Sequence, residues 1–416
     1  MRGMVLVLAA TAGLVSMAGD LRPPLLLENT QVLPAGVRNP RFIQGFMSVS
    51  SRYGDHGATE PLGERLNKNV TWQDVIDAQA DEAQKNVVRS VLADNDLSVD
   101  GSPGRATGVV HSWVDVKVPI LAVGITARLT AAVIVPILSA RISVDTAFER
   151  SDQGQKFVDS LGEISPDKAT EAAAKLNDAT QQKLARLRYV PARPETFSGI
   201  GDVQLMAKYA WISRVEEGLA GKLVLTLPTG RGPDPDRALD VPLGDSRYKV
   251  GAMLIYSRDL AGSLRSTSHA GYTVMLPHSL QRRLPASATD SLSADGITVD
   301  RQWGENATFG TAFEWRLDSA GLGLTGAYVF QYQGRSRYSG PSLDPAGQLR
   351  MSYLEALEPG QQLHSLSAAV GFSTVDWYRA GRFALPLQAN VVYSQPVAGK
   401  SVPSAGALAG EIVMFF

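Results

Sequence analysis

The sequence predicts an all-β protein, an antiparallel transmembrane β-barrel of about 12 strands, with a range of roughly 10 to 14. Three observations in the 416-residue chain predict it: many segments alternate apolar and polar residues, the connections divide into short and long ones, and the last segment ends on Phe416. We expect helices only inside long extracellular connections, near residues 54–106 and 149–198.

Alternation is strongest after residue 200. Leu205, Tyr209 and Trp211 share one face of a segment whose other face carries Gln204 and Lys208. A strand sends alternate side chains to opposite faces, so one face would meet lipid and the other the interior. Such segments reach the length of about 9 to 11 residues that a tilted strand needs to cross a bilayer. Their polar faces favour a wet lumen over a dry core, where polar groups would lack partners.

The connections are an independent observation, because outer-membrane barrels pair short periplasmic turns with longer external loops. Every second connection is short, including Ala261-Gly262, Ser319-Ala320 and Ala380-Gly381. The expected strands cover residues 42–53, 107–118, 124–148, 200–213, 218–229, 247–259, 263–277, 308–318, 321–333, 365–379, 382–395 and 404–416. The stretch from Ile125 to Val144 changes phase around Pro136, which fits a bulge, a loop rim or an unrecognised hairpin.

Residues 1–19 have the pattern of a cleavable signal peptide. Arg2 precedes an apolar or small run from Val5 to Leu14, and Ser16-Met17-Ala18 supplies the small residues of a cleavage site. The mature outer-membrane barrel domain would then cover residues 20–416. The absence of Cys suits an oxidising compartment.

Two long loops carry helical patterns. Ser165-Pro166-Asp167 predicts a helix start, because Ser caps, Pro suits the first helical position and an acid favours the first turn. Ala-rich sequence continues to Tyr189, and residues 72–92 look similar. These helices would form either a cap on the barrel rim or a lid or plug that narrows the lumen.

The C-terminal strand resembles the signal that the barrel-assembly machinery of outer membranes reads. That signal is a terminal aromatic residue with alternating apolar residues before it. The matching residues are Leu408, Gly410, Ile412, Met414 and Phe416.

Ten residues fall on the faces that we expect to line the pore. Because bases outnumber acids among them, a mild anion preference is one interpretation, and pairing across a narrow lumen is the other. They are Asp115, Lys117, Arg128, Lys208, Lys222, Lys249, Arg265, His269, Glu314 and Arg316.

The sequence contains few of the motifs that would indicate an enzyme. None of the five His residues forms the His-Glu-x-x-His pair of a zinc helix, and no Gly-x-Ser-x-Gly elbow or phosphate loop occurs. The acidic run from Asp94 to Gly101 spaces oxygen ligands as calcium loops do, but Thr107 stands where a closing acid belongs. We therefore predict no catalytic residue, metal or cofactor. A net charge of −1 speaks against nucleic acid as a partner.

One region resembles a known family. The segment from Gly199 to Tyr209, the Leu225-Thr-Leu-Pro-Thr-Gly230 segment and residues 251–259 resemble the outer-membrane family labelled as meta-pathway phenol-degradation proteins. That family is similar to fatty-acid and aromatic-hydrocarbon transporters, and the resemblance covers mainly residues 196–276. It implies an outer-membrane barrel that transports aromatic or other apolar solutes.

The leading functional hypothesis is therefore a channel for passive uptake of small solutes, including hydrophobic or aromatic ones, through a narrow loop-gated lumen. Its expected partners are outer-membrane lipid, the assembly machinery during insertion, and the solute. The alternative is a structural or surface-interaction barrel that presents extracellular loops to a partner. A barrel hydrolase is weakest, because no nucleophile with its base is recognisable.

Overall fold

A computed structural model describes residues 21–64, 67–77, 82–164, 167, 170, 179–191, 193–237, 240–285, 293–317, 321–340 and 343–416. The predicted signal peptide, residues 1–19, and the predicted helix start at Ser165-Pro166 lie outside these residues. Within them, no helix is long and apolar enough to cross a membrane.

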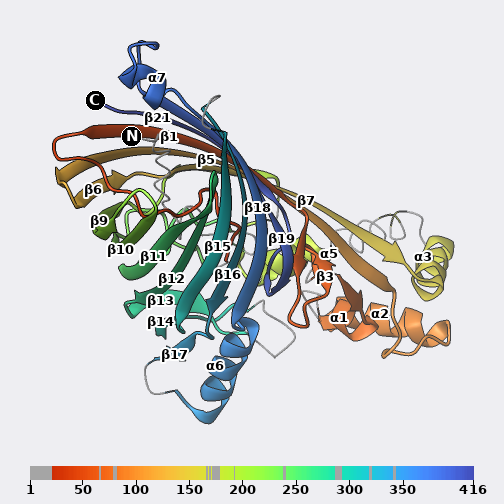
Figure 1. Cartoon of the computed structure of the whole chain (residues 1–416). Helices are drawn as coiled ribbons and strands as arrows, with labels where there is room; N and C mark the ends of the chain where they lie inside the picture. The colour runs from red at the N-terminus through yellow and green to blue at the C-terminus, as the bar shows by residue number, and fades with distance from the viewer. Residues whose placement is uncertain are drawn as a thin grey trace.

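The chain forms a closed antiparallel barrel of 12 strands, as predicted. Each strand pairs with its sequence neighbour in the ring, and β1 closes the ring by pairing with both β21 and β5 (Figure 1). The strands are β1 (Arg38–Val49), β5 (Gly104–Thr126), β6 (Leu129–Ile134), β9 (Gln204–Ser213), β10 (Glu217–Thr226), β11 (Lys249–Ala261), β12 (Leu264–Met275), β15 (Asn306–Leu317), β16 (Leu322–Gln333), β18 (Gln361–Ser373), β19 (Leu387–Lys400) and β21 (Ala407–Met414).

Two of these strands have an extension that is separated from them by a short break. β7 (Ile137–Arg150) follows β6 after Val135-Pro136 and pairs with the first half of β5. β8 (Glu195–Ile200) precedes β9 and pairs with β7. The break is bridged by hydrogen bonds, since Val135 N donates to Pro119 O over 3.1 Å and Gly201 N donates to Pro136 O over 2.8 Å. Burial of even-numbered residues continues from Thr130 to Val144, so the alternation does not change phase at Pro136.

Two predicted connections are misplaced. We expected a turn at residues 119–123, but β5 runs through them to Thr126, because Pro119 sits on the outer face while Val118, Ile120 and Ala122 keep the inner alternation. We also expected strands up to residue 379 and from residue 382. Instead β18 ends at Ser373, α7 (Val375–Arg379) follows, and β19 begins at Leu387.

The two ends of the barrel differ. One end carries only short connections and α7; the other carries the long ones (Figure 1). We call them the short-turn end and the long-loop end. The long-loop end holds α1 (Trp72–Asp77), α2 (Glu82–Asp94), α3 (Asp152–Ile164), α5 (Ala179–Arg186), α6 (Pro345–Leu357), a sheet of β13 (His278–Arg283), β14 (Gly296–Gln302) and β17 (Arg337–Ser339), a second sheet of β2 (Ser51–Tyr53), β3 (Thr59–Pro61) and β20 (Val402–Pro403), and β4 (Lys68–Val70) beside β5.

Helices do occupy both predicted loop regions. Helix α6 was not predicted, although its signals are present: the Asp344 side chain accepts a hydrogen bond from Gly347 N over 2.7 Å, and Pro345 takes the first helical position.

The outer surface of the barrel is apolar and rich in aromatic side chains, as a lipid-facing wall requires. These side chains occupy alternate strand positions and remain well exposed. Examples are Phe42, Phe46, Trp113, Leu121, Leu205, Tyr209, Trp211, Leu223, Leu254, Phe309, Phe313, Trp315, Leu366, Val391, Leu408 and Ile412.

Candidate functional site: the barrel lumen

An extended stretch of chain, residues 21–37, runs through the lumen along its length; we call it the N-terminal segment. At the long-loop end, Leu21 N donates to Gln361 Oε1 over 3.0 Å. Midway, Ser394 Oγ donates to Pro24 O over 2.6 Å. Near the short-turn end, Leu33 N donates to Thr130 Oγ1 over 2.7 Å. Backbone groups without secondary structure are thus satisfied by the barrel wall. The lumen is occupied by the protein's own chain.

The inner wall has an apolar half and a polar half. We expected polar inner faces throughout, and this is wrong for β1, β5, β6 and β7. Their inner side chains form the main hydrophobic core with Leu26 and Leu33 of the N-terminal segment. The wall residues include Ile43, Met47, Val110, Val114, Val116, Val118, Ile120, Ile134 and Leu138.

The polar half fits the expectation. Its buried side chains come from β9 to β12 and from β18 to β21, and many bond to one another. They include Gln204, Lys208, Lys222, Thr226, Ser257, Arg265, Thr267, Ser365, Ser367, Gln388, Asn390, Ser394 and Glu411.

Three of the ten predicted pore residues do not reach the lumen. Asp115 and Lys117 lie on the outer face of β5, because Val114, Val116 and Val118 take the inner positions. Arg128 lies exposed in the turn between β5 and β6. Alternation alone does not show which face of a strand lies inside the barrel. In β5 the apolar face lies inside.

The other seven predicted residues occupy inward positions: Lys208, Lys222, Lys249, Arg265, His269, Glu314 and Arg316. Two of them hold the N-terminal segment. Lys222 Nζ forms an ion pair with Glu28, and Lys208 Nζ donates to Asn29 Oδ1 over 3.1 Å. Two others meet at the short-turn end, where Asp259 Oδ1 pairs with Arg265 Nε at 2.8 Å and with Arg316 Nη2 at 2.9 Å.

The predicted assembly residues lie on β21 and just after it. Leu408, Gly410, Ile412 and Met414 occupy the outer face, and Phe416 is exposed. Phe416 and Arg38 exchange both backbone hydrogen bonds at 2.9 Å, which extends the β1–β21 seam. Recognition by assembly machinery remains a prediction.

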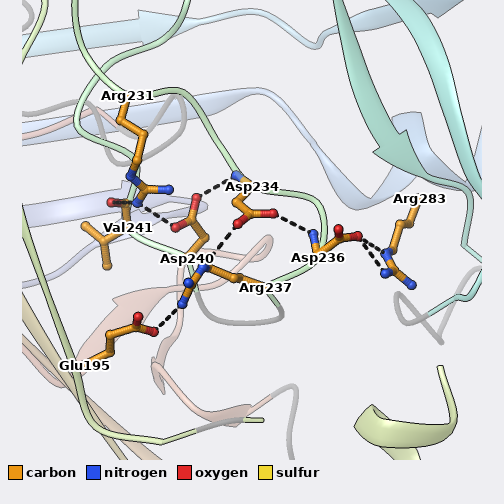
Figure 2. Close-up of polar contacts among 8 residues, drawn as sticks. All are labelled: Glu195, Arg231, Asp234, Asp236, Arg237, Asp240, Val241 and Arg283. Carbon is orange, nitrogen blue, oxygen red and sulfur yellow. Dashed lines mark hydrogen bonds and ion pairs between the residues drawn. The ribbon is translucent and has the colours of Figure 1, made fainter. Parts of the chain in front are cut away.

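The connection between β10 and β11, residues 227–248, folds toward the barrel axis; we call it the β10–β11 loop. Figure 2 shows the ion pairs that hold its outer part: Arg231 to Asp240 at 2.7 Å, Arg237 to Glu195 at 2.5 Å, and Arg283 of β13 to Asp236 at 2.6 Å. Its inner part is buried at residues 241–245 and at Arg247, and Val241 and Leu243 join the main core.

Asp202, at the break between β8 and β9, anchors this loop. Its Oδ1 accepts from Gly230 N over 3.0 Å and its Oδ2 from Asp245 N over 2.9 Å. Thr229 Oγ1 donates to Gly201 O over 2.7 Å and accepts from Val203 N over 2.9 Å. Two of the three segments that carry the family resemblance, Gly199–Tyr209 and Leu225–Gly230, therefore contact each other. Gly230 is required because a Cβ there would meet Gly244 at 2.8 Å.

A cavity of about 150 Å³ remains between the N-terminal segment and the wall. Leu21, Pro23, Pro24 and Leu25 line it on one side, with Met47, Val114 and Val116 behind them. Arg247 and Lys249 line the opposite side, together with Thr226, Thr273, Asn306, Thr308, Gln331 and Gln333. Of the predicted residues, Lys222 and Lys249 border this cavity; Arg247 was missed, because it lies in a loop without periodicity.

Charges concentrate around Arg247 at the long-loop end. Burial opposes ionisation of Asp245, yet Lys249 and Arg247 outweigh it and lower the pKa of this carboxyl to about 2. Burial lowers the pKa of the Arg247 guanidinium to about 10. Arg247 and Arg301 both stack on the Trp303 indole, at 3.3 and 3.4 Å from the ring centre. Glu358 pairs with Arg301 and, at 3.1 Å, with Arg282.

The architecture defines the class of protein: a 12-strand β-barrel of the outer-membrane type. Among solved structures, the chain is similar to the COG4313 outer membrane channel of Pseudomonas putida F1, with 14% identity and a TM-score of 0.52 over 93% of this chain and 98% of that chain. This likeness shows the barrel fold.

Two toluene transporters are more distant. TbuX of Ralstonia pickettii has 10% identity and a TM-score of 0.35 over 92% of this chain and 90% of that chain. TodX of Pseudomonas putida has 8% identity and a TM-score of 0.32 over 92% of this chain and 89% of that chain. No protein-family profile matches the sequence, and no curated protein matches it.

Proposed function

We propose that this protein is an outer-membrane channel for passive uptake of small solutes, with apolar and aromatic molecules as the preferred class. The observation that carries the proposal is the lumen cavity of about 150 Å³, apolar on one side and polar on the other. That volume resembles a cavity that accepts one benzene ring. A lumen with an apolar wall offers such a solute a path that a water-filled porin does not.

Within this proposal, the signal peptide delivers the chain to the periplasm, the C-terminal strand directs assembly, and the apolar belt contacts outer-membrane lipid. The long-loop end faces outward. The narrowing elements are the N-terminal segment and the β10–β11 loop, because both lie inside the barrel. This replaces the expected lid of rim helices as the first candidate for gating.

Planar-bilayer conductance and uptake of radiolabelled phenol by cells that make the protein test the proposal. Removing residues 22–31 should raise conductance severalfold, because it clears the lumen. The deletion keeps β1 and the hydrogen bond from Leu33 to Thr130. Deletion of residues 160–190, which lie in the rim loop, is the matched control and should change conductance less. A sealed bilayer for the wild type and both deletions, with no phenol uptake, would overturn the channel.

One observation favours the surface-interaction alternative. The first half of β5 and its partner β7 lead beyond the ring to α1, α2 and α3 (Figure 1). Trp72, Ile76, Leu92 and Phe157 give these helices a hydrophobic core of their own. If this protrusion served only a surface partner, the 160–190 deletion would abolish cell-surface binding and leave solute flux unchanged.

A further inference from the structure

Arg247 presents the least satisfied buried charge beside the cavity. Its side chain is 1% exposed, and Nη2 forms an ion pair with Asp245 Oδ2 at 3.3 Å. Nε and Nη1 have no hydrogen-bond partner in the described part of the chain. Burying guanidinium N–H groups without acceptors is costly, so an acceptor at this position would be strongly favoured.

The charge around Arg247 favours an anionic acceptor. The cavity is lined by four cationic side chains, Arg22, Lys222, Arg247 and Lys249, and by one carboxylate, Asp245. Glu28 pairs with Lys222, so cations still outnumber carboxylates around the cavity. Asp202 already accepts two backbone N–H groups, and Asp245 is shared between Lys249 and Arg247. A ligand anion would complete the set.

The rest of the cavity sets the shape of that ligand. Leu25 and Val116 both lie close to Gly45, so the lining from residues 21–25, β1 and β5 is mostly apolar, with Arg22 as its charged member. Gln331 also lines the cavity, and its Oε1 has no donor among the described residues. The volume of about 150 Å³ admits roughly one aromatic ring. A ligand with a charged head and a single flat apolar body would therefore fit this cavity.

We propose that the cavity binds a small monocarboxylate with one aromatic ring, its carboxylate paired with Arg247 and its ring against Leu25, Val114 and Val116. This rests on the proposed channel function and narrows its substrate class. The Nη1 of Arg247, which has no partner among the described residues, can donate a charge-assisted hydrogen bond to a carboxylate oxygen. The binding site lies on the solute's path, between the β10–β11 loop and the N-terminal segment.

Calorimetry on the detergent-solubilised full barrel tests the proposal with benzoate, benzamide and acetate. Benzamide keeps the ring without the charge, and acetate keeps the charge without the ring. Benzoate should bind most tightly. Arg247→Gln should weaken benzoate binding by about ten- to a hundredfold and weaken benzamide binding much less, because the amide carbonyl loses only a hydrogen bond to a neutral acceptor. Arg247→Lys keeps the charge but loses the guanidinium N–H groups and should give an intermediate affinity.

Arg231→Gln is the matched control, because Arg231 belongs to the same loop and pairs with Asp240 but does not line the cavity. It should bind benzoate as the wild type does, and heat-modifiable gel mobility should show that all variants fold. Equal affinities for benzoate and benzamide, or for wild type and Arg247→Gln, would mean that water satisfies Arg247 and would overturn the proposal. Binding is measured here without transport, so the two proposals can fail separately. A barrel that conducts but does not bind benzoate refutes only this inference. A barrel that binds benzoate but never conducts refutes only the channel.

Discussion

Glu28 and Lys222 form an ion pair inside the barrel, with side-chain exposures of 0% and 2%. Glu28 belongs to the N-terminal segment and Lys222 to β10, so this contact joins the lumen chain to the wall. Replacing one member of a buried pair costs about 3–5 kcal/mol, because the other charge stays buried without its partner. We expect Glu28→Gln to lower the unfolding free energy by about that amount.

Urea unfolding in detergent micelles, followed by gel mobility, measures this loss. The double variant Glu28→Gln/Lys222→Met should recover much of the stability, since it removes the orphaned charge as well. Glu82→Gln, which breaks an exposed pair with Arg89 in α2, should have no measurable effect. A Glu28→Gln variant as stable as the wild type would contradict the buried pair.

Asp202→Ala should release the β10–β11 loop from the lumen. It removes a carboxylate that accepts from two backbone N–H groups, and each hydrogen bond to a charged group contributes about 1.5–3 kcal/mol. We expect faster proteolysis within residues 227–248 and higher conductance. Asp376→Asn, in the exposed α7 at the other end, should change neither. Unchanged proteolysis in Asp202→Ala would show that the other contacts of the loop hold it without this carboxylate.

Gly124→Ala should displace the N-terminal segment. A Cβ at this position would collide with the carbonyl of Pro34, and neither backbone can yield without moving the chain around it. The variant should unfold at lower urea concentration and conduct more than the wild type. Gly326→Ala is the matched control, because its Cβ would meet nothing within 4 Å. Equal behaviour of the two variants would contradict the close approach of segment and wall.

His278 should make the long-loop end sensitive to acid. Burial, and then Arg247 and Arg301, lower the pKa of this imidazole to about 4. An unfolded His has a pKa near 6.5, so between about pH 6.5 and 4 the unfolded chain binds a proton that the folded chain does not. Stability should therefore fall as the pH falls through this window. His278→Gln should remove that part of the slope of unfolding midpoint against pH; an identical slope would contradict it.

The barrel was predictable because alternation is local. Leu205, Tyr209 and Trp211 already identify a lipid-facing strand, and the connections reveal the topology. Which face of β5 points inward was not predictable, because Val114 and Val116 suit a lipid-facing surface as well as a core. Only the tertiary structure decides, because the N-terminal segment supplies Leu25 and Leu26 to cover those valines.

The occupation of the lumen by the N-terminal segment was also not predictable from sequence patterns. Residues 21–37 have neither helical nor strand periodicity, and their hydrogen bonds reach partners as distant as Gln361 and Ser394. Arg247 lies in an irregular loop, and its role depends on burial beside Trp303 rather than on spacing. Such sites are defined by contacts between distant segments, which a single sequence does not display.

The path of residues 21–37 has a consequence for how the molecule is put together. Leu21 lies at one mouth of the cylinder while β1 starts at the other, and β1 supplies half of the final seam with β21. If the wall wraps around a peptide already laid along its axis, a bulky folded cargo fused immediately upstream of Leu21 should stall closure of the seam. The same cargo inserted in the exposed turn at Arg128 should leave closure free.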